Sequence, residues 1–399
     1  MITKIFNIKS IVTYNPDLDD IIIEDIDSII IKDKRILHIN PKTEDIVINH
    51  EIDAKQTLIT PGFIDSHTHL IFASNRANDF LSRVSGKSYL DIAESGGGIK
   101  SSIESLRNTT KEELVAKCLK DINNIIEAGT TTIEAKSGYG LTLEDEIKSL
   151  EVIKELNQIS SIDIIPTFMG AHDFPPESIE RDSYIDLVCN EMIPEISRNG
   201  LAEFCDIFCE EGYFDHEQTK RICNIAKRNN LGIKLHVDEF KDSNGAYLAG
   251  ELNAISADHL MKSNIRGLTH MAKNSVVATI LPGTTLFLGM STYANGRQII
   301  DAGCDIALAS DYNPGSSTIY SLPIIMALSC LYCGLSVEEA FKGVTYNAAK
   351  ALDRHSSIGL IKENYFADLL FWDIEEIAEI PYWFNSDRLL MIMKKGSLV

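Results

Sequence analysis

Residues 58–70 read "LITPGFIDSHTHL", a short apolar run followed by two histidines with a single residue between them. In a β-strand, side chains two positions apart point to the same face, so His67 and His69 can converge on one point. Two neutral imidazoles held in this way form either half of a metal site or a pair of buried polar rings that need hydrogen-bond partners. The stretch therefore predicts a buried strand that ends in polar side chains.

Seven further β-branched apolar segments follow, and amphipathic helical windows such as 143–158 and 215–230 lie between them. The segments are "TTTIEAKSG" (130–138), "SIDIIPTFMGAH" (161–172), "EFCDIFCEEG" (203–212), "GIKLHVDE" (232–239), "AISADHL" (254–260), "VVATILPGT" (276–284) and "DIALASDYNPGS" (305–316). Parallel strands that are covered on both faces read as apolar runs of this kind. About eight such units predict an α/β fold, a (β/α)₈ TIM-like barrel over residues 61–359.

The two ends of the chain lack this alternation. Residues 1–60 and 360–399 contain short apolar runs broken by charged residues, without a helical period. Because chain termini often lie close together, we expect these two pieces to complete one small all-β domain.

The chain has 399 residues, and 37 Lys and Arg against 58 Asp and Glu give a formal net charge of −21. This acidic excess argues against nucleic acid and anionic membranes as partners. No apolar run reaches the length of about 20 residues that a membrane helix needs, and we expect a cytoplasmic protein. The eight cysteines show no secretory pattern. "CLYC" (330–333) has redox spacing but lies in an apolar helical stretch, where buried thiols are the simpler interpretation.

Polar residues gather where the expected strands end, and in barrels the carboxyl ends of the strands carry the active site. These residues are His67 and His69, Lys136 to Tyr139, His172, His236 and Glu239, His259, and Asp311 and Asn313.

Four of these side chains, His67, His69, His236 and Asp311, form a set of three nitrogens and one oxygen that suits Zn²⁺ or Fe²⁺. A metal at this position makes water acidic enough to supply hydroxide at neutral pH. Asp311 can also take the proton of that water, and His259 can polarise a carbonyl oxygen across the site. The arrangement predicts metal-assisted hydrolysis of a carbon–nitrogen bond.

Several motifs resemble those of the amidohydrolase superfamily and, within it, the imidazolonepropionase family. They are "PGFIDSHTHL", "GKSYLDI" (86–92), "GGGI" (96–99), "EAKSGYGLTLEDEIKSL", "TFMGAH", "HVDE", "ISADHL", "LPGT" and "DYNPGSS". The resemblance implies a distorted barrel and a β-sandwich built from both chain ends. It also implies hydrolysis of 4-imidazolone-5-propanoate to N-formimidoyl-L-glutamate with one divalent metal per subunit, Zn²⁺ or Fe²⁺/Fe³⁺, and a homodimer.

The resemblance further assigns roles to individual residues. The metal ligands are again His67, His69, His236 and Asp311, and the catalytic groups are His259, Asp311 and Glu239. The residues expected to contact substrate or product are Arg76, Tyr139, His172, Glu239, Asn313, Gly315 and Ser316.

Physical chemistry agrees with several of these roles. The planar fork of Arg76 suits the propanoate, and the turn at 313–317 offers backbone N–H groups as a second hold. Tyr139, between two glycines, is expected on a mobile loop. Glu239 follows His236 by three residues and can bind the ring or position water; the sequence does not separate these roles.

Some residues depart from the family pattern. Asn364 stands where glycine is common, and asparagine tolerates the left-handed backbone that such a turn needs. Ala73 and Ser74 also replace common glycines. "CEEG" (209–212) lacks the lysine that bridges two metals in other superfamily members, so we expect one metal.

Several alternatives stay open. Glu210 could be a ligand of a second metal, and Cys209 could be a nucleophile. The Gly-rich stretch 95–102 is expected to be a mobile lid. The chain could also act as an aminopyrimidine or purine deaminase, or be an inactive barrel kept as a binding module.

Overall fold

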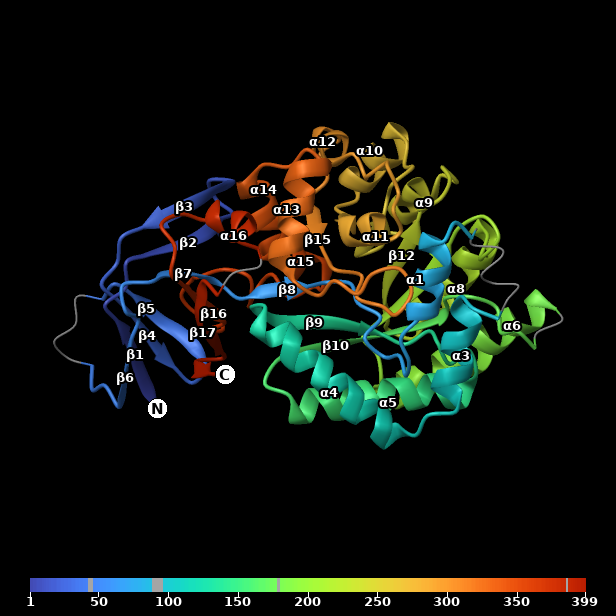
Figure 1. Cartoon of the computed structure of the whole chain (residues 1–399), viewed down its shortest axis with the longest axis horizontal. Helices are drawn as coiled ribbons and strands as arrows, with labels where there is room; N and C mark the ends of the chain where they lie inside the picture. Colours follow the sequence, from blue (N-terminus) through green and yellow to red (C-terminus); the bar gives the residue numbers. More distant parts are fainter. Residues whose placement is uncertain (42–45, 88–95, 178–179, 385–386) are drawn as a thin grey trace.

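The computed structural model describes residues 1–41, 46–87, 96–177, 180–384 and 387–399. Its centre is a nearly closed parallel sheet of eight strands that follow one another in chain order (Figure 1). The strands are β8 (Phe63–Asp65), β9 (Thr130–Lys136), β10 (Asp163–Ala171), β11 (Phe204–Cys209), β12 (Gly232–Val237), β13 (Ser256–His259), β14 (Val277–Ile280) and β15 (Ile306–Leu308). The expected TIM-like barrel is therefore confirmed, and each of the eight apolar segments contributes its strand.

Helices cover the outside of this sheet, as Figure 1 shows. Those up to β12 are α1 (Ala77–Val84), α3 (Ile99–Arg107), α4 (Lys111–Glu127), α5 (Leu143–Ile159), α6 (Arg181–Leu187), a π-helical turn (Val188–Met192), α7 (Ile193–Arg198) and α8 (His216–Arg228). Later ones are α9 (Gly245–Glu251), α10 (Ile265–Lys273), α11 (Pro282–Phe287), α12 (Gly296–Asp301), α13 (Leu322–Tyr332), α14 (Val337–Val344) and α15 (Tyr346–Ala351). The short helix α16 (Glu379–Tyr382) packs against α13 instead.

Local sequence explains where several helices start. Thr110 and Glu113 form a capping box at the start of α4, and Asp215 with Gln218 does the same for α8. Each box satisfies backbone N–H groups that the first turn leaves without partners. The helices then bury one face against the strands, for example Leu114 and Ile122 of α4.

Two smaller sheets lie at one end of the molecule, together with both termini (Figure 1). One has the order β5 (Arg35–Ile39), β4 (Ser28–Lys32), β1 (Ile2–Phe6), β6 (His50–Asp53). The other has the order β18 (Ser397–Leu398), β17 (Leu389–Lys394), β16 (Leu369–Trp372), β7 (Leu58–Pro61), β2 (Ser10–Asn15), β3 (Asp20–Glu24). Strands from both chain ends thus share one sheet, while the domain limits at residues 60 and 360 stay a prediction.

The two small sheets enclose an apolar cluster of their own, which includes Ile5, Ile29, Leu369 and Phe371. Asn364 takes the expected left-handed backbone, with φ of 71°, and its N–H donates to the carbonyl of Ile36. Among the described residues, no helix combines the length and hydropathy needed to cross a membrane.

Candidate active site

A cavity of about 540 Å³ opens at the carboxyl ends of the barrel strands. Most of the expected site residues line it, whereas His67 is fully buried beneath. The lining includes His69, Arg76, Tyr139, His172, His236, Glu239, His259, Asp311, Asn313, Gly315 and Ser316. The barrel therefore brings together side chains that lie far apart in the sequence.

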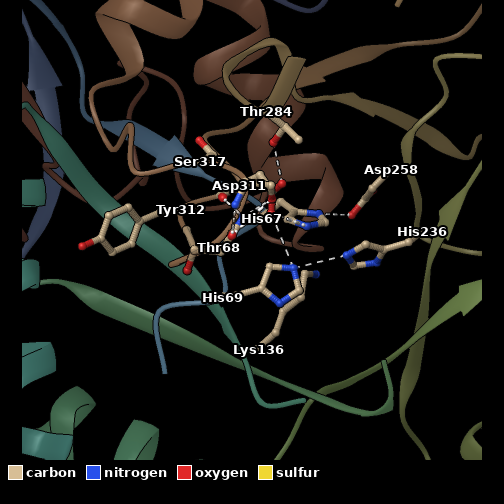
Figure 2. A network of polar contacts seen from close by, with 12 residues as sticks. His67, Thr68, His69, Lys136, His236, Asp258, Thr284, Asp311, Tyr312 and Ser317 are labelled. Carbon is tan, nitrogen blue, oxygen red and sulfur yellow. Dashed lines mark hydrogen bonds and ion pairs between the residues drawn. The ribbon is translucent and has the colours of Figure 1, made fainter. Parts of the chain in front are cut away.

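The segments after β8 and β15 meet where the barrel closes. The N–H of Asp311 donates to the carbonyl of His67 at 3.0 Å, and the N–H of His69 donates to the carbonyl of Tyr312 at 2.9 Å. These bonds hold the histidine pair beside the aspartate, as Figure 2 shows. Asp311 has a left-handed backbone with φ of 51°, and His259, at the end of β13, has φ of 77°. Such backbone conformations are costly for non-glycine residues and occur often at functional sites.

Two of the histidines are oriented by buried carboxylates. His67 Nδ1 lies 2.6 Å from Asp258 Oδ2, and His236 Nδ1 lies 3.0 Å from Asp206 Oδ1. An ionised carboxylate only accepts, so each Nδ1 carries the proton and each Nε2 presents a lone pair. Metal-binding histidines are usually held in this way by a carboxylate or carbonyl.

Ring nitrogens of three histidines and one carboxylate oxygen converge here. His67 Nε2 and His69 Nε2 each lie 3.5 Å from Asp311 Oδ1, and His236 Nε2 lies 3.3 Å from His69 Nε2. Within the part of the chain that the structure describes, buried His67 Nε2 has no hydrogen-bond partner. The acceptor nitrogens of His67 and His236 and the Asp311 carboxylate present lone pairs that a cation would satisfy. The donor set therefore fits a divalent metal (Figure 2).

Burial keeps the rings in the form that binds metal. Desolvation, with the nearby Lys136 ammonium, lowers the pKa of His67 well below its usual value, and desolvation also lowers the pKa of His69 and His259. These imidazoles are accordingly neutral near pH 7, as metal ligation requires.

Asp311 uses its two oxygens differently. Oδ1 faces the histidine nitrogens, and Oδ2 accepts a hydrogen bond from the Thr284 hydroxyl at 2.5 Å. Burial raises the pKa of Asp311 to about 6, although Thr284 opposes the rise. A carboxylate with a pKa near neutrality can take up and release a proton during a reaction.

His259 and Glu239 lie on the other side of this cluster. Ligand atoms of His259, His67 and His236 all lie within 4.8 Å of one another, so His259 is near enough to act as a ligand as well as to polarise a carbonyl. Its Nε2 lies 3.6 Å from Glu239 Oε2. Burial, reinforced by the charge of Asp311, raises the pKa of Glu239 well above its usual value.

Backbone N–H groups engage the Glu210 carboxylate. Its Oε2 accepts from the backbone N–H groups of Glu239 and Phe240, at 2.9 and 3.1 Å. These two bonds occupy one carboxylate oxygen, which favours an anchoring role over second-metal ligation. Cys209 is buried, and desolvation raises the pKa of its thiol to about 12, so the thiolate is scarce at neutral pH.

A buried lysine lies beneath the cluster. Lys136 Nζ is 2.7 Å from both Glu134 Oε2 and Asp206 Oδ2. Burial alone would lower the pKa of Lys136, but these two carboxylates raise it overall. The ammonium in turn keeps Asp206 ionised and able to orient His236.

The expectation of a mobile loop at Tyr139 is not met by the structure. Buried Glu146 accepts hydrogen bonds from the N–H groups of Gly138, Gly140 and Leu141 at 3.2, 2.9 and 2.9 Å. Three bonds to one carboxylate oxygen fasten the loop, and Tyr139 is only 3% exposed. The Tyr139 ring lies 5.2 Å from that of His172, which stacks on His69 at 4.9 Å.

Arg76 lies at the cavity wall just before α1. Its Nε–H donates to Asp79 Oδ2 at 2.7 Å. The turn beside it is organised by Asn313, whose Oδ1 accepts from the N–H groups of Gly315 and Ser316 at 2.8 and 2.7 Å. Those two N–H groups are thus engaged within the turn, and the Arg76 guanidinium lies beside them at this wall.

Part of the expected lid and of the "GKSYLDI" motif lies outside the described residues, which resume at Gly96. From Ile99 the chain is helical, as the start of α3. Whether the stretch 95–102 moves as a lid stays a prediction.

Sequence reasoning missed several residues that support the site. They are Asp206, Asp258, Glu134, Thr284, Asp79, Arg83 and Glu146. A signal existed for Asp206 and Glu134, because a carboxylate within a buried apolar strand must have a partner in the barrel interior.

Comparison with protein families places this chain among known hydrolases. The family model described as "Amidohydrolase family" matches residues 58–399. An imidazolonepropionase from Thermoanaerobacter pseudethanolicus is 41% identical over 98% of this chain and 96% of its own length. Another from Alkaliphilus oremlandii is 44% identical over 87% of this chain and 83% of its own.

Solved structures share the fold at low sequence identity. A zinc-bound adenosine deaminase from Xanthomonas campestris has a TM-score of 0.75 and 13% identity, covering 99% of this chain and 92% of its own. A triazine hydrolase from an Arthrobacter has a TM-score of 0.74 and 16% identity, covering 100% and 94%. The family match and the histidine–aspartate cluster together support a divalent metal in the cavity.

Proposed function

This chain belongs to the amidohydrolase family, and on that premise we propose that it hydrolyses 4-imidazolone-5-propanoate to N-formimidoyl-L-glutamate. Imidazolonepropionases that are 41% and 44% identical over most of the chain support this activity. The carrying observation is that the guanidinium of Arg76 lines the same cavity as the metal-binding cluster. A ring that carries a carboxylate can meet both at once.

In this proposal, His67, His69, His236 and Asp311 hold one divalent ion, Zn²⁺ or Fe²⁺/Fe³⁺. When bound, such an ion supplies Lewis-acid chemistry, which polarises a carbonyl and acidifies water. Asp258 and Asp206 fix the two histidines that they contact. The charge of the divalent ion would balance that of the Asp311 carboxylate.

The chain's own side chains carry the protons. Asp311 accepts a proton from the attacking water at Oδ2, the oxygen that Thr284 steers. Water adds to the lactam carbonyl carbon, the carbon–nitrogen bond of the ring breaks, and Asp311 returns its proton to the leaving nitrogen. His259 donates a hydrogen bond to the carbonyl oxygen as negative charge develops there.

Other residues hold the substrate in this pose. Arg76 binds the propanoate through its guanidinium fork. Glu239, whose raised pKa favours the protonated form, exchanges hydrogen bonds with the ring. Tyr139 and His172 contact the ring from the opposite wall, and Asn313 with its turn, including Gly315 and Ser316, shapes the carboxylate end. The homodimer rests on the resemblance alone, and the cytoplasmic location rests on the sequence pattern.

The test is an absorbance assay of ring opening on freshly made imidazolone propanoate, with wild type and His259→Ala at equal metal content. We expect wild type to turn over, and the variant to lose roughly 10²- to 10³-fold in kcat, the usual effect of removing one such donor. Ammonia release from aminopyrimidines or purines without imidazolone opening would contradict the proposal and favour a deaminase. Unchanged kcat in the variant would remove His259 from the chemistry.

A further inference from the structure

A row of charged residues begins just before α1 and continues along one side of it. Arg76 immediately precedes the helix, and Asp79 and Arg83, four residues apart, share one side of it. All three line the cavity. We call these three residues the α1 stripe; only Arg76 has a role in the proposed function.

We propose that Asp79 and Arg83 are positioning residues that clamp Arg76 so that its fork faces the substrate carboxylate; this inference rests on the proposed function. Asp79 Oδ2 accepts from Arg76 Nε at 2.7 Å and from the Gly98 N–H at 2.9 Å. With Nε engaged, a carboxylate in the cavity meets the edge formed by Nη1 and Nη2. That edge offers two parallel N–H donors.

The second half of the clamp is the turn at Gly315. A Cβ placed on Gly315 would lie 2.2 Å from Nη1 of Arg76, so the guanidinium lies directly against this glycine. Arg83 Nη2 donates to the carbonyl of Gly315 at 3.1 Å, and its Nη1 donates to the carbonyl of Phe287 at 3.1 Å. Arg83 therefore holds in place the backbone on which Arg76 rests.

Charge within the stripe favours an anion. Two guanidiniums and one carboxylate leave one positive charge in the stripe, although the whole chain carries a formal net charge of −21. A single carboxylate balances this charge. The burial of the side chains, 12% exposed for Arg76 and 10% for Asp79, makes their ion pair stronger than one in open solvent.

The test measures binding rather than turnover, with the unreactive probe 3-(imidazol-4-yl)propanoate and its neutral propanamide by titration calorimetry on the metal-loaded protein. We expect Asp79→Ala to raise the Kd of the propanoate about 10- to 100-fold, in the range of a lost charge-assisted hydrogen bond. Asp79→Asn keeps an acceptor oxygen and is expected to cost about threefold or less. Neither variant should change the Kd of the propanamide.

Two further comparisons separate a clamp from a general structural role. Combined with Arg76→Met, Asp79→Ala should add no further loss, since it acts through Arg76. Arg83→Met should raise the Kd of the propanoate about threefold to tenfold and likewise add nothing after Arg76→Met. If Asp79→Ala does not fold, the Kd values of Arg83→Met, with and without Arg76→Met, test the proposal. Leu81→Ala, on the exposed side of α1, is the matched control and should bind like wild type.

Equal losses with and without Arg76, or equal losses for propanoate and propanamide, would overturn the clamp. If the binding data follow the expected pattern but the wild type does not open the imidazolone, the proposed function alone is contradicted. The two failures are therefore distinguishable.

Discussion

Two parts of the cavity hold charged groups by different means. The floor is the cluster of His67, His69, His236 and Asp311, and the α1 wall is the α1 stripe with the turn at Gly315. On the floor, His67 follows β8 and His236 lies near the end of β12, and carboxylates on β13 and β11 orient them. On the α1 wall, Arg76 is held by a short helix and by a turn that is distant in sequence. The floor inherits its geometry from the β-ladder, whereas the wall depends on side chains that hold one another.

This difference predicts two kinds of mutational effect. Changes on the floor should alter metal binding and kcat, because the reacting atoms lie there. Changes on the α1 wall should alter KM and the preference for a carboxylate, and leave metal binding intact.

The largest effect is expected on the floor, from Asp311→Asn. In the proposed mechanism Asp311 takes a proton from water. The amide cannot accept it, so kcat should fall about 10²- to 10⁴-fold. Turnover and metal content have to be measured on the same samples. A variant that keeps both its metal and its kcat would contradict the role of Asp311 as the proton acceptor.

A smaller effect on the floor is expected from Asp258→Ala. Without the 2.6 Å contact to His67 Nδ1, that ring loses its fixed orientation. Metal affinity should fall about 10- to 100-fold, as measured by competition with a chromogenic chelator.

The control for this variant is Asp305→Ala, which removes a carboxylate that precedes β15 and pairs with Lys350 away from the histidines. It should bind metal like wild type. Equal losses of affinity in the two variants would mean that the Asp258 effect is a general destabilisation of the barrel.

Much of the floor could be predicted, because the barrel is regular. His67 and His69 follow a strand at a spacing of two, and parallel strand ends meet at one rim, so their convergence with His236 and Asp311 could be predicted. Asp258 was not predicted, because its contact with His67 joins β13 to the segment after β8, and these two strands are not neighbours in the sheet.

The wall was less predictable. The family resemblance and the chemistry of a carboxylate predict Arg76, but its partners Asp79 and Arg83 depend on where α1 starts, and α1 has only eight residues. The loop at Tyr139 shows the same limit. Two glycines suggested mobility, while the fastening carboxylate comes from Glu146, six residues beyond Gly140.

The smallest effect is expected on the wall, from Gly315→Ala. The added Cβ would lie 2.2 Å from Arg76 Nη1, so the guanidinium must shift. KM for imidazolone propanoate should rise about 10-fold, the effect of weakening one charge-assisted contact, while metal content stays at the wild-type level. Steady-state kinetics with elemental analysis checks both.

The matched control is Thr318→Ala, at an exposed position three residues later. It should leave KM unchanged. If Gly315→Ala instead lowers the metal content, the floor and the α1 wall are not independent, and the comparison drawn between them fails.

The most direct measurement is ring-opening turnover before and after removal of metal by a chelator, with metal counted per chain in each sample. The account predicts one divalent ion per chain, loss of turnover in proportion to loss of metal, and recovery when Zn²⁺ or Fe²⁺ is restored. Full turnover by chains that hold no metal would contradict it.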